Sequence, residues 1–242
     1  MPESELWITR LFNEHLAGLG NSLLALVHMP AQPSPWADFM VMQIVVAGLL
    51  AAIFAILRFR LSADRPGKLQ QTFELWYEFV LGQAEDQLGR EGHRYLSFFG
   101  TIFLFILASN LIGLIPVFES PTMNVPVTFG CALATFAYYH LMGIRAHGPG
   151  YAGQFAGPLW WLAPLMIPIE IISHLARVLS LTVRLYANMF AGEQVTLVFL
   201  GMTKFGAPIA FMGLHLFVGV VQAYIFMLLA MAYVGGAVAH EH

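Results

Sequence analysis

Polar and ionisable side chains interrupt one long apolar run, residues 159–200. They include Glu170, Ser173, His174, Arg177, Ser180, Arg184, Asn188, Glu193 and Gln194. A charge at the centre of a bilayer costs about 2.5–3.5 kcal/mol on insertion scales, so it normally faces water, a partner charge or an ion path. Arginine keeps its proton even there, whereas carboxylate and imidazole groups can take up and release protons. The set therefore indicates side chains that face water, a partner charge or a functional path inside a membrane.

The spacing of these residues assigns them to faces of a helix. At about 100° per residue, Arg177, Arg184 and Asn188 share one face. Glu193, nine residues after Arg184, points to the opposite side. One helix would thus offer a cation to one neighbour and a carboxylate to another.

The last apolar run, residues 208–239, carries His215 and Gln222 seven residues apart, hence on one face. If the last two runs form an antiparallel hairpin that turns near residues 203–204, Glu193 lies opposite His215 and Arg184 lies opposite Gln222. Both pairs fit one register, which predicts that they meet inside the membrane.

The composition predicts that helices in a bilayer position these residues. The chain of 242 residues is 58% hydrophobic and 10% charged, whereas soluble domains carry about 25% charged residues. We expect an all-α polytopic membrane protein with five membrane-crossing helices plus one amphipathic surface helix, the last two crossings forming a long, strongly tilted hairpin. The chain reads as one membrane domain, 1–242, made of an external segment (1–35), a first span (39–57), an amphipathic cytoplasmic-surface helix (70–88), a hairpin (95–118 and 125–144) and the tilted hairpin (159–200 and 208–239).

The fourth crossing is twice the usual length. As one helix, residues 159–200 would extend about 63 Å at 1.5 Å per residue, across a hydrocarbon core about 30 Å thick. The helix must therefore tilt strongly or break, and the alternative is two ordinary spans with a short turn. Gly192 is the only glycine inside the run and residues 171–183 carry no turn signal, which favours one helix.

The basic residues predict the orientation. Those of the two loops that lie on one side are Arg58, Arg60, Arg65, Lys68, Arg90, Arg94 and Arg145, whereas Arg10 and Lys204 fall on the other side. The positive-inside rule makes the first side cytoplasmic, with the N-terminus outside and the C-terminus inside. No presequence pattern is visible, so we expect a bacterial plasma membrane, with an organellar thylakoid membrane as the alternative.

Two sequence motifs of this chain resemble those of a known protein family. One motif resembles the signature of subunit a of F-type ATP synthases. It is the run Pro168-Ile-Glu170-Ile-Ile-Ser173-His-Leu-Ala-Arg177-Val-Leu-Ser180-Leu-Thr-Val-Arg184-Leu-Tyr-Ala-Asn188-Met-Phe-Ala-Gly192-Glu193. The same holds for His215 followed by Gln222-Ala-Tyr-Ile-Phe-Met227. The resemblance covers the whole chain in topology and about residues 95–239 in motifs.

The resemblance implies a role in a rotary motor. Subunit a is the stator beside a rotating ring of c subunits, each with a membrane-embedded carboxylate, and the subunit b peripheral stalk and other synthase subunits would be further partners. The essential arginine maps onto Arg184. The other ion-translocation residues it implies are Asn188, Glu193, His215 and Gln222 on the external side and Glu170 on the cytoplasmic side, with Asn110, Ser173, His174 and Arg177 as further candidates.

The same resemblance places the ATP chemistry in other subunits. It implies no catalytic residue, cofactor, metal or nucleic acid for this chain. The proton is the expected ion, with sodium left open. Some family members have aspartate at the positions of Gly113 and Asn124, and many have proline at that of Val178, so the external access path here should be less acidic.

Two other classes compete with this reading. An intramembrane metalloenzyme could use Glu170, His174, Glu193 and His215, but the chain has no H-E-x-x-H motif, and Arg177 one turn from His174 would repel a cation. A passive scaffold would leave the cost of Arg184 unexplained. His28, His93, His140 and His147 are expected at the membrane interface rather than in a site.

Overall fold

The computed structural model describes residues 6–26, 28–62, 66–115, 118–151, 163–202 and 206–238. The described part contains helices and no strand, which confirms the all-α prediction. Its α-helices are α1 (Trp7–Leu26), α2 (Asp38–Arg60), α3 (Lys68–Leu88), α4 (Leu96–Ile112), α5 (Val125–His147), α7 (Ala163–Met202) and α8 (Ala207–Val238). Three short 3-10 helices, η1 (Gly89–Tyr95), η2 (Pro121–Met123) and η3 (Gly148–Gly150), lie in the connections. Five helical stretches of this part are long and apolar enough to cross a membrane, as predicted.

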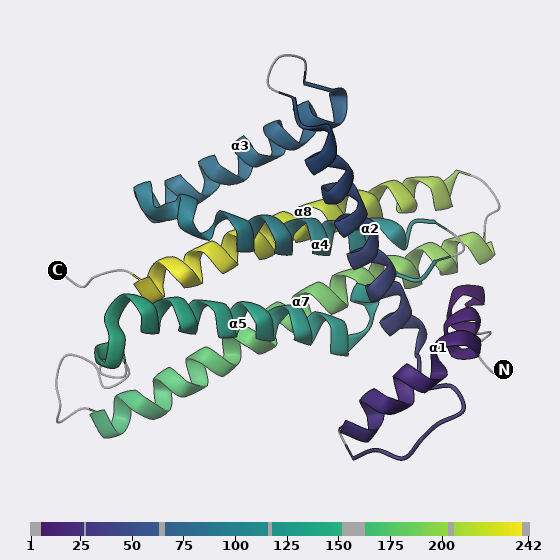
Figure 1. The fold of residues 1–242 in the computed structure, drawn as a ribbon, viewed down its shortest axis with the longest axis horizontal. Helices are drawn as coiled ribbons and strands as arrows, with labels where there is room; N and C mark the ends of the chain where they lie inside the picture. The colour runs from purple at the N-terminus through teal and green to yellow at the C-terminus, as the bar shows by residue number, and fades with distance from the viewer. Residues whose placement is uncertain are drawn as a thin grey trace.

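The long helices α4, α5, α7 and α8 run beside one another, and α2 crosses them steeply (Figure 1). Helix α8 packs against α3, α4, α5 and α7, so it forms the centre of the bundle. Its side chains Phe226, Met227 and Met231 are fully buried. The core therefore follows α8 along much of its length, and the outer helices keep one apolar face uncovered.

Helix α7 is continuous over 40 residues, Ala163–Met202. The chain thus adopts the single-helix alternative and not two spans with a turn. Pro168 lies near its beginning, where a missing N–H disturbs few hydrogen bonds. Residues 159–162 of the predicted span, and Ala239 at the end of the next one, lie outside the described residues.

The amphipathic helix α3 is fastened to the bundle by close contacts. A Cβ placed on Gly100 of α4 would come within 2.6 Å of the Trp76 ring, so only glycine admits that ring. The Tyr224 hydroxyl of α8 donates a hydrogen bond of 2.8 Å to the side-chain oxygen of Gln83. Gly89, at φ +66°, then ends α3 and turns the chain toward α4.

Two features go beyond the predicted elements. Most of the N-terminal segment forms helix α1, whose Asn13 and Asn21 side chains hydrogen-bond to the backbone of Trp36 and Gln32. Helix α4 ends at Ile112, earlier than the span predicted to end at residue 118. A Cβ on Gly113 would lie 2.6 Å from that of Ser120, so the chain folds back tightly there.

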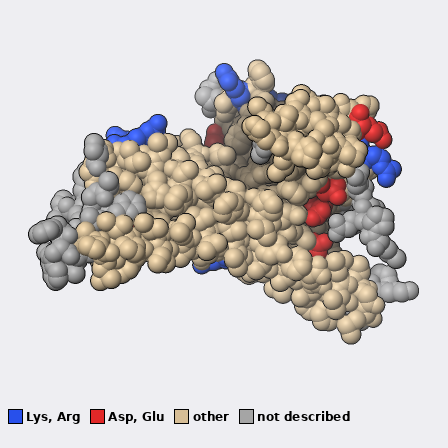
Figure 2. All heavy atoms as spheres, turned by 90° about the horizontal axis from the view of Figure 1, so that it is seen from below, with Lys and Arg blue, Asp and Glu red and all other residues tan. Residues whose placement is uncertain are grey.

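Figure 2 shows that most of one face of the molecule carries no charged side chain. Its acidic side chains gather at the end where Figure 1 shows α1. A broad uncharged surface with charges at its margins is what a lipid-embedded protein presents.

Candidate functional site

Arg184 lies on the uncovered face of α7. Its side chain is exposed and, within the described ranges, forms no hydrogen bond or ion pair. The exposed residues Ser180, Ala187 and Ala191 on the same face are small, and Val183 beside it is 58% exposed. A cation therefore stands on a surface where small side chains allow another helix to approach closely.

A first polar group, here called the turn-side cluster, lies between Arg184 and the α7–α8 connection. It consists of Asn188, Glu193, His215 and Gln222, together with Gly192. The Asn188 side-chain N–H donates a 2.8 Å hydrogen bond to the Gln222 oxygen. Gln222 is 3% exposed, and its Nε2 has no partner among the described residues. A buried amide with an unused donor marks a place where water or an ion ligand would be stabilised.

His215 is held against Gly192. A Cβ on Gly192 would stand 2.5 Å from the His215 Nδ1, so the absence of a side chain makes room for the ring. Beside these two residues a cavity of about 230 Å³ is lined by Asn188 and otherwise mostly apolar side chains. Glu193 is half-buried one residue further along α7.

The hairpin brings α7 and α8 together, but neither predicted pair is seen as such. His215 packs against Gly192 rather than forming a contact with Glu193 among the described residues. The sequence predicted that Arg184 would meet Gln222, whereas Gln222 bonds to Asn188, one helical turn further along. Arg184 instead projects from the face that α8 leaves uncovered. The difference has a geometric cause, because four residues along a helix turn the side chain by about 40°.

Asn110 is buried and fastens α4 to α8. It is 1% exposed, its N–H donates a 2.8 Å hydrogen bond to the Gly219 carbonyl, and its oxygen accepts one of 2.7 Å from Thr122. Asn124 donates a 3.0 Å hydrogen bond to the Glu119 carboxylate, which stands near this end of the molecule. Sequence reasoning missed Thr122 and Glu119, which carried no helical spacing signal.

A second polar group, the loop-side cluster, lies toward the beginning of α7. It consists of Glu170, His174 and Arg177 from α7, Tyr139 and His140 from α5, and Tyr151 after η3. The Nε2 of His174 lies 3.3 Å from the Glu170 carboxylate, and its Nδ1 lies 2.6 Å from the Tyr139 hydroxyl. Ser173, half-buried on the same helix, forms no contact that joins it to this group.

His140 completes the loop-side cluster. Its Nδ1 lies 2.8 Å from the Tyr151 hydroxyl, and its ring centroid lies 4.7 Å from that of His174. Burial raises the pKa of the Tyr151 hydroxyl above its ordinary value, so the group stays protonated at neutral pH. His140 therefore belongs to the loop-side cluster, because α5 carries it to the α7 surface.

Arg177 does not share the exposure of Arg184. Its guanidinium lies 5.3 Å from the centre of the Tyr233 ring of α8, an attractive arrangement for a cation. A small cavity of about 110 Å³ is lined by Tyr139, Tyr151, Glu170, His174, Arg177, Gly236 and Ala237. Arg177 thus faces the interior of the loop-side cluster, two helical turns or about 10 Å before Arg184.

The two clusters lie on opposite sides of Arg184 along α7. Glu170 precedes Arg184 by 14 residues, about 21 Å of helix, and Glu193 follows it by nine residues, about 14 Å. Glu170 and His174 are therefore far from Glu193 and His215, too far to hold one metal ion together. Within the described ranges no group of three acidic, histidine or cysteine side chains is arranged for a metal.

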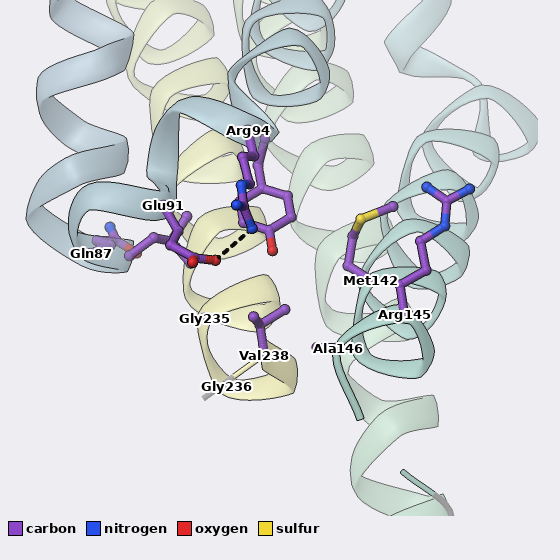
Figure 3. A pocket seen from close by; sticks show the side chains of 11 residues that line it. Gln87, Glu91, Arg94, Met142, Arg145, Ala146, Gly235, Gly236 and Val238 are labelled. Atoms are coloured by element: carbon purple, nitrogen blue, oxygen red, sulfur yellow. Dashed lines mark hydrogen bonds and ion pairs between the residues drawn. The ribbon is translucent and has the colours of Figure 1, made fainter. Parts of the chain in front are cut away.

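A wide pocket opens beside the loop-side cluster (Figure 3). It has a volume of about 1030 Å³. Glu91 and Arg94, which form an ion pair of 3.1 Å, line one wall, and Met142 and Arg145 line another. Gly236 of α8 lines both this pocket and the small cavity, so the two spaces are neighbours.

Comparisons with known proteins cover nearly the whole chain. A family model described as ATP synthase A chain matches residues 40–235. A protein described as ATP synthase subunit a from Solibacter usitatus (strain Ellin6076) is 61% identical over 233 residues, which is 96% of this chain and 100% of the relative. Another, from Koribacter versatilis (strain Ellin345), is 46% identical and covers 98% of both chains. ATP synthase subunit a 1 of Syntrophotalea carbinolica (strain DSM 2380 / NBRC 103641 / GraBd1) is 43% identical, over 80% of this chain and 82% of the relative.

Proposed function

Because the chain belongs to the ATP synthase subunit a family, we propose that it is the ion-translocating stator of a rotary F-type ATP synthase, and that the ion is a proton. The ATP chemistry takes place in other subunits. The observation that carries the proposal is Arg184, a cation with no partner among the described residues on an exposed helix face.

Charge energetics give Arg184 its role. A carboxylate on the c ring must be neutral while it faces lipid, because an ionised one would be very costly there. Beside Arg184 it can ionise, since a nearby cation favours the charged form. Arginine also keeps its proton, so it cannot itself become a leak. Each ring carboxylate must then unload on one side of Arg184 and reload on the other.

The two clusters supply the half-channels. The turn-side residues Asn188, Glu193, His215 and Gln222 form the external one, whose polar groups lead from the α7–α8 end toward Arg184. Glu170 and His174 form the cytoplasmic one, with Ser173 and Arg177 beside them. Their offset of roughly 35 Å along α7 leaves Arg184 between them, so a proton passes only by riding on the ring. Asn110 acts in this scheme by holding α4 and α8 at the correct distance.

The partners follow from the exposed surfaces. The α7 face with Ser180, Arg184, Ala187 and Ala191 receives the ring of c subunits, and subunit b contacts the stator elsewhere. We place the protein in a bacterial plasma membrane with its N-terminus outside and its C-terminus in the cytoplasm, by the positive-inside rule.

The membrane potential then drives the motion. It supplies about 2.3 kcal/mol per elementary charge per 100 mV. One ion is therefore not enough to make one ATP, and several must pass for each nucleotide.

ATP-driven proton pumping in inverted vesicles tests the proposal. We expect Arg184→Ala to abolish pumping in an assembled complex that still hydrolyses ATP, and Glu193→Gln to reduce pumping in part. Arg60→Ala, which removes an exposed arginine at the end of α2, serves as the matched control. Normal pumping in Arg184→Ala would refute the mechanism and leave a scaffold. A strict sodium requirement in the wild type would refute the proton as the ion.

A further inference from the structure

Tyr139 extends the loop-side cluster from α7 onto α5. Its hydroxyl lies 2.6 Å from the Nδ1 of His174, whose Nε2 lies 3.3 Å from the Glu170 carboxylate. The three groups thus lie in sequence, with a hydrogen bond between Tyr139 and His174 and an ion-pair contact between His174 and Glu170. The Tyr139 ring is 1% exposed and stacks on the His174 ring, with centroids 5.7 Å apart. Phenylalanine could fill the same space, but it would lack the hydroxyl that interacts with His174 and Arg177.

Glu170, His174 and Tyr139 all line one polar cavity. The cavity of about 110 Å³ is lined by both tyrosines of the cluster and by its three α7 residues. A water molecule takes about 30 Å³ of liquid and stays in a cavity that offers polar partners. The space is therefore large and polar enough for a few water molecules in contact with the Tyr139 hydroxyl.

The position of Gly236 connects this cavity with the wide pocket. Gly236 lines both spaces, and a Cβ built there would have no heavy atom within 4 Å. Figure 3 shows Gly236 on α8, between the wall formed by Glu91 and the wall formed by Met142 and Arg145. A longer side chain at this position would extend into open space and narrow the connection.

Resting on the function proposed above, we propose that the cytoplasmic half-channel runs from Glu170 through His174 to the Tyr139 hydroxyl and leaves the protein past Gly236 into the wide pocket. Tyr139 and Gly236 are then residues of the proton path that lie on α5 and α8, outside the α7 motif.

The proton transfer balances at each atom. Protonated Glu170 gives its proton to the Nε2 of His174, the Nδ1–H of His174 passes to the Tyr139 oxygen, and the former Tyr139 proton passes to a cavity water. Glu170 ends as a carboxylate, while His174 and Tyr139 keep their number of protons. Because the Arg177 guanidinium lines the cavity and repels a hydronium there, the excess proton passes on through the cavity water to the wide pocket. His174 regains its first tautomer by exchanging one proton with cavity water.

Tyr139→Phe in the complete ATP synthase tests the hydroxyl. It keeps the buried ring and removes only the group in the path. We expect ATP-driven pumping to fall by about tenfold at equal assembly, with a larger solvent deuterium isotope effect than in the wild type. Tyr138→Phe is the matched control, because Tyr138 lies next in the helix and stacks on Phe98. It should pump at the wild-type rate with the wild-type isotope effect.

Gly236→Leu tests the connection independently of Tyr139. We expect Gly236→Leu to slow pumping severalfold and Gly236→Ala to leave it near the wild-type rate, because the small methyl group fits the space. Both substitutions favour a helix over glycine, so loss of folding would not explain a difference between them.

The outcomes separate this inference from the proposed function. Wild-type pumping with an unchanged isotope effect in Tyr139→Phe, or equal pumping in Gly236→Leu and Gly236→Ala, would overturn the path proposed here. Arg184→Ala is measured in the same vesicles. If Arg184→Ala abolishes pumping while Tyr139→Phe pumps normally, only the path is wrong; if Arg184→Ala pumps normally, the stator function itself fails.

Discussion

Replacing Gly192 with alanine should displace His215 from the turn-side cluster. The added Cβ would stand 2.5 Å from the Nδ1 and 3.1 Å from the Cε1 of the His215 ring. Ordinary contacts of this kind begin near 3.4 Å, so the ring must move by about 1 Å or the helices must separate. His215 is 8% exposed but borders the cavity of about 230 Å³ beside Gly192, so the ring has space into which it can be displaced.

The expected cost follows from two opposing effects. Overpacking of this kind costs about 1–3 kcal/mol, while alanine is favoured over glycine inside a helix by about 1 kcal/mol. The net loss of stability is therefore about 0–2 kcal/mol, small enough for the complex to assemble. The functional loss should be larger, because hydrogen-bonded transfer weakens steeply when its geometry is lost.

The assay is ATP-driven pumping per assembled complex, combined with the rate of thermal inactivation. Gly213→Ala is the matched control, since a Cβ at Gly213 of α8 meets no heavy atom within 4 Å. We expect Gly192→Ala to pump severalfold more slowly and Gly213→Ala to pump normally. Equal pumping by the two variants would refute the reasoning that Gly192 holds His215 in its working position.

Two further predictions concern the amides of the bundle. Asn110→Ala removes the two hydrogen bonds that join α4 to Gly219 and Thr122. Because such bonds in membranes contribute about 0.6 kcal/mol each on average, we expect a loss of stability of roughly 1–2 kcal/mol. The loss should be seen as faster thermal inactivation, with normal pumping per assembled complex. A pumping defect without faster inactivation would instead place Asn110 in the ion path. Asn188→Leu removes the remaining hydrogen bond of Gln222, whose Nε2 already has no partner among the described residues. We expect a loss of stability of about 1–3 kcal/mol and slower pumping. Unchanged stability together with unchanged pumping would contradict the pairing of Asn188 with Gln222.

The continuity of α7 was predictable because it depends on local sequence. Residues 171–183 carry no turn signal, and the helical period repeats through them, so one helix was favoured over two. Arg184 was predictable for a different reason. The cost of a charge in an apolar run marks both Arg177 and Arg184 as residues to be explained, and the resemblance to a family motif singled out Arg184.

The loop-side cluster was not predictable in the same way. Tyr139 and His174 are separated by 35 residues and meet through the packing of α5 on α7. Helical spacing relates residues within one helix and says nothing about the rotation of a neighbouring helix. His140 therefore read as an interfacial residue, although its ring lies 4.7 Å from that of His174.

Contacts between residues far apart in the sequence determine how helix α1 is held and where helix α4 ends. Helix α1 is joined to the returning chain by Asn13 and Asn21, which bond to residues 11–23 positions away. Helix α4 stops at Ile112 because the chain folds back so that Ser120 packs on Gly113. That contact also explains why no aspartate stands at Gly113, because any Cβ there would collide with Ser120.

The exposed position of Arg184 has a consequence for the order of assembly. In a subunit without its partner, this cation would face lipid, at a cost of about 2.5–3.5 kcal/mol. A partner that brings a carboxylate to the α7 face relieves that cost, which corresponds to roughly a hundredfold in the association constant. If Arg184 acts on the ring as proposed, the same charge makes the unassembled subunit less stable than the assembled one. Assembly into the complete complex is then favoured.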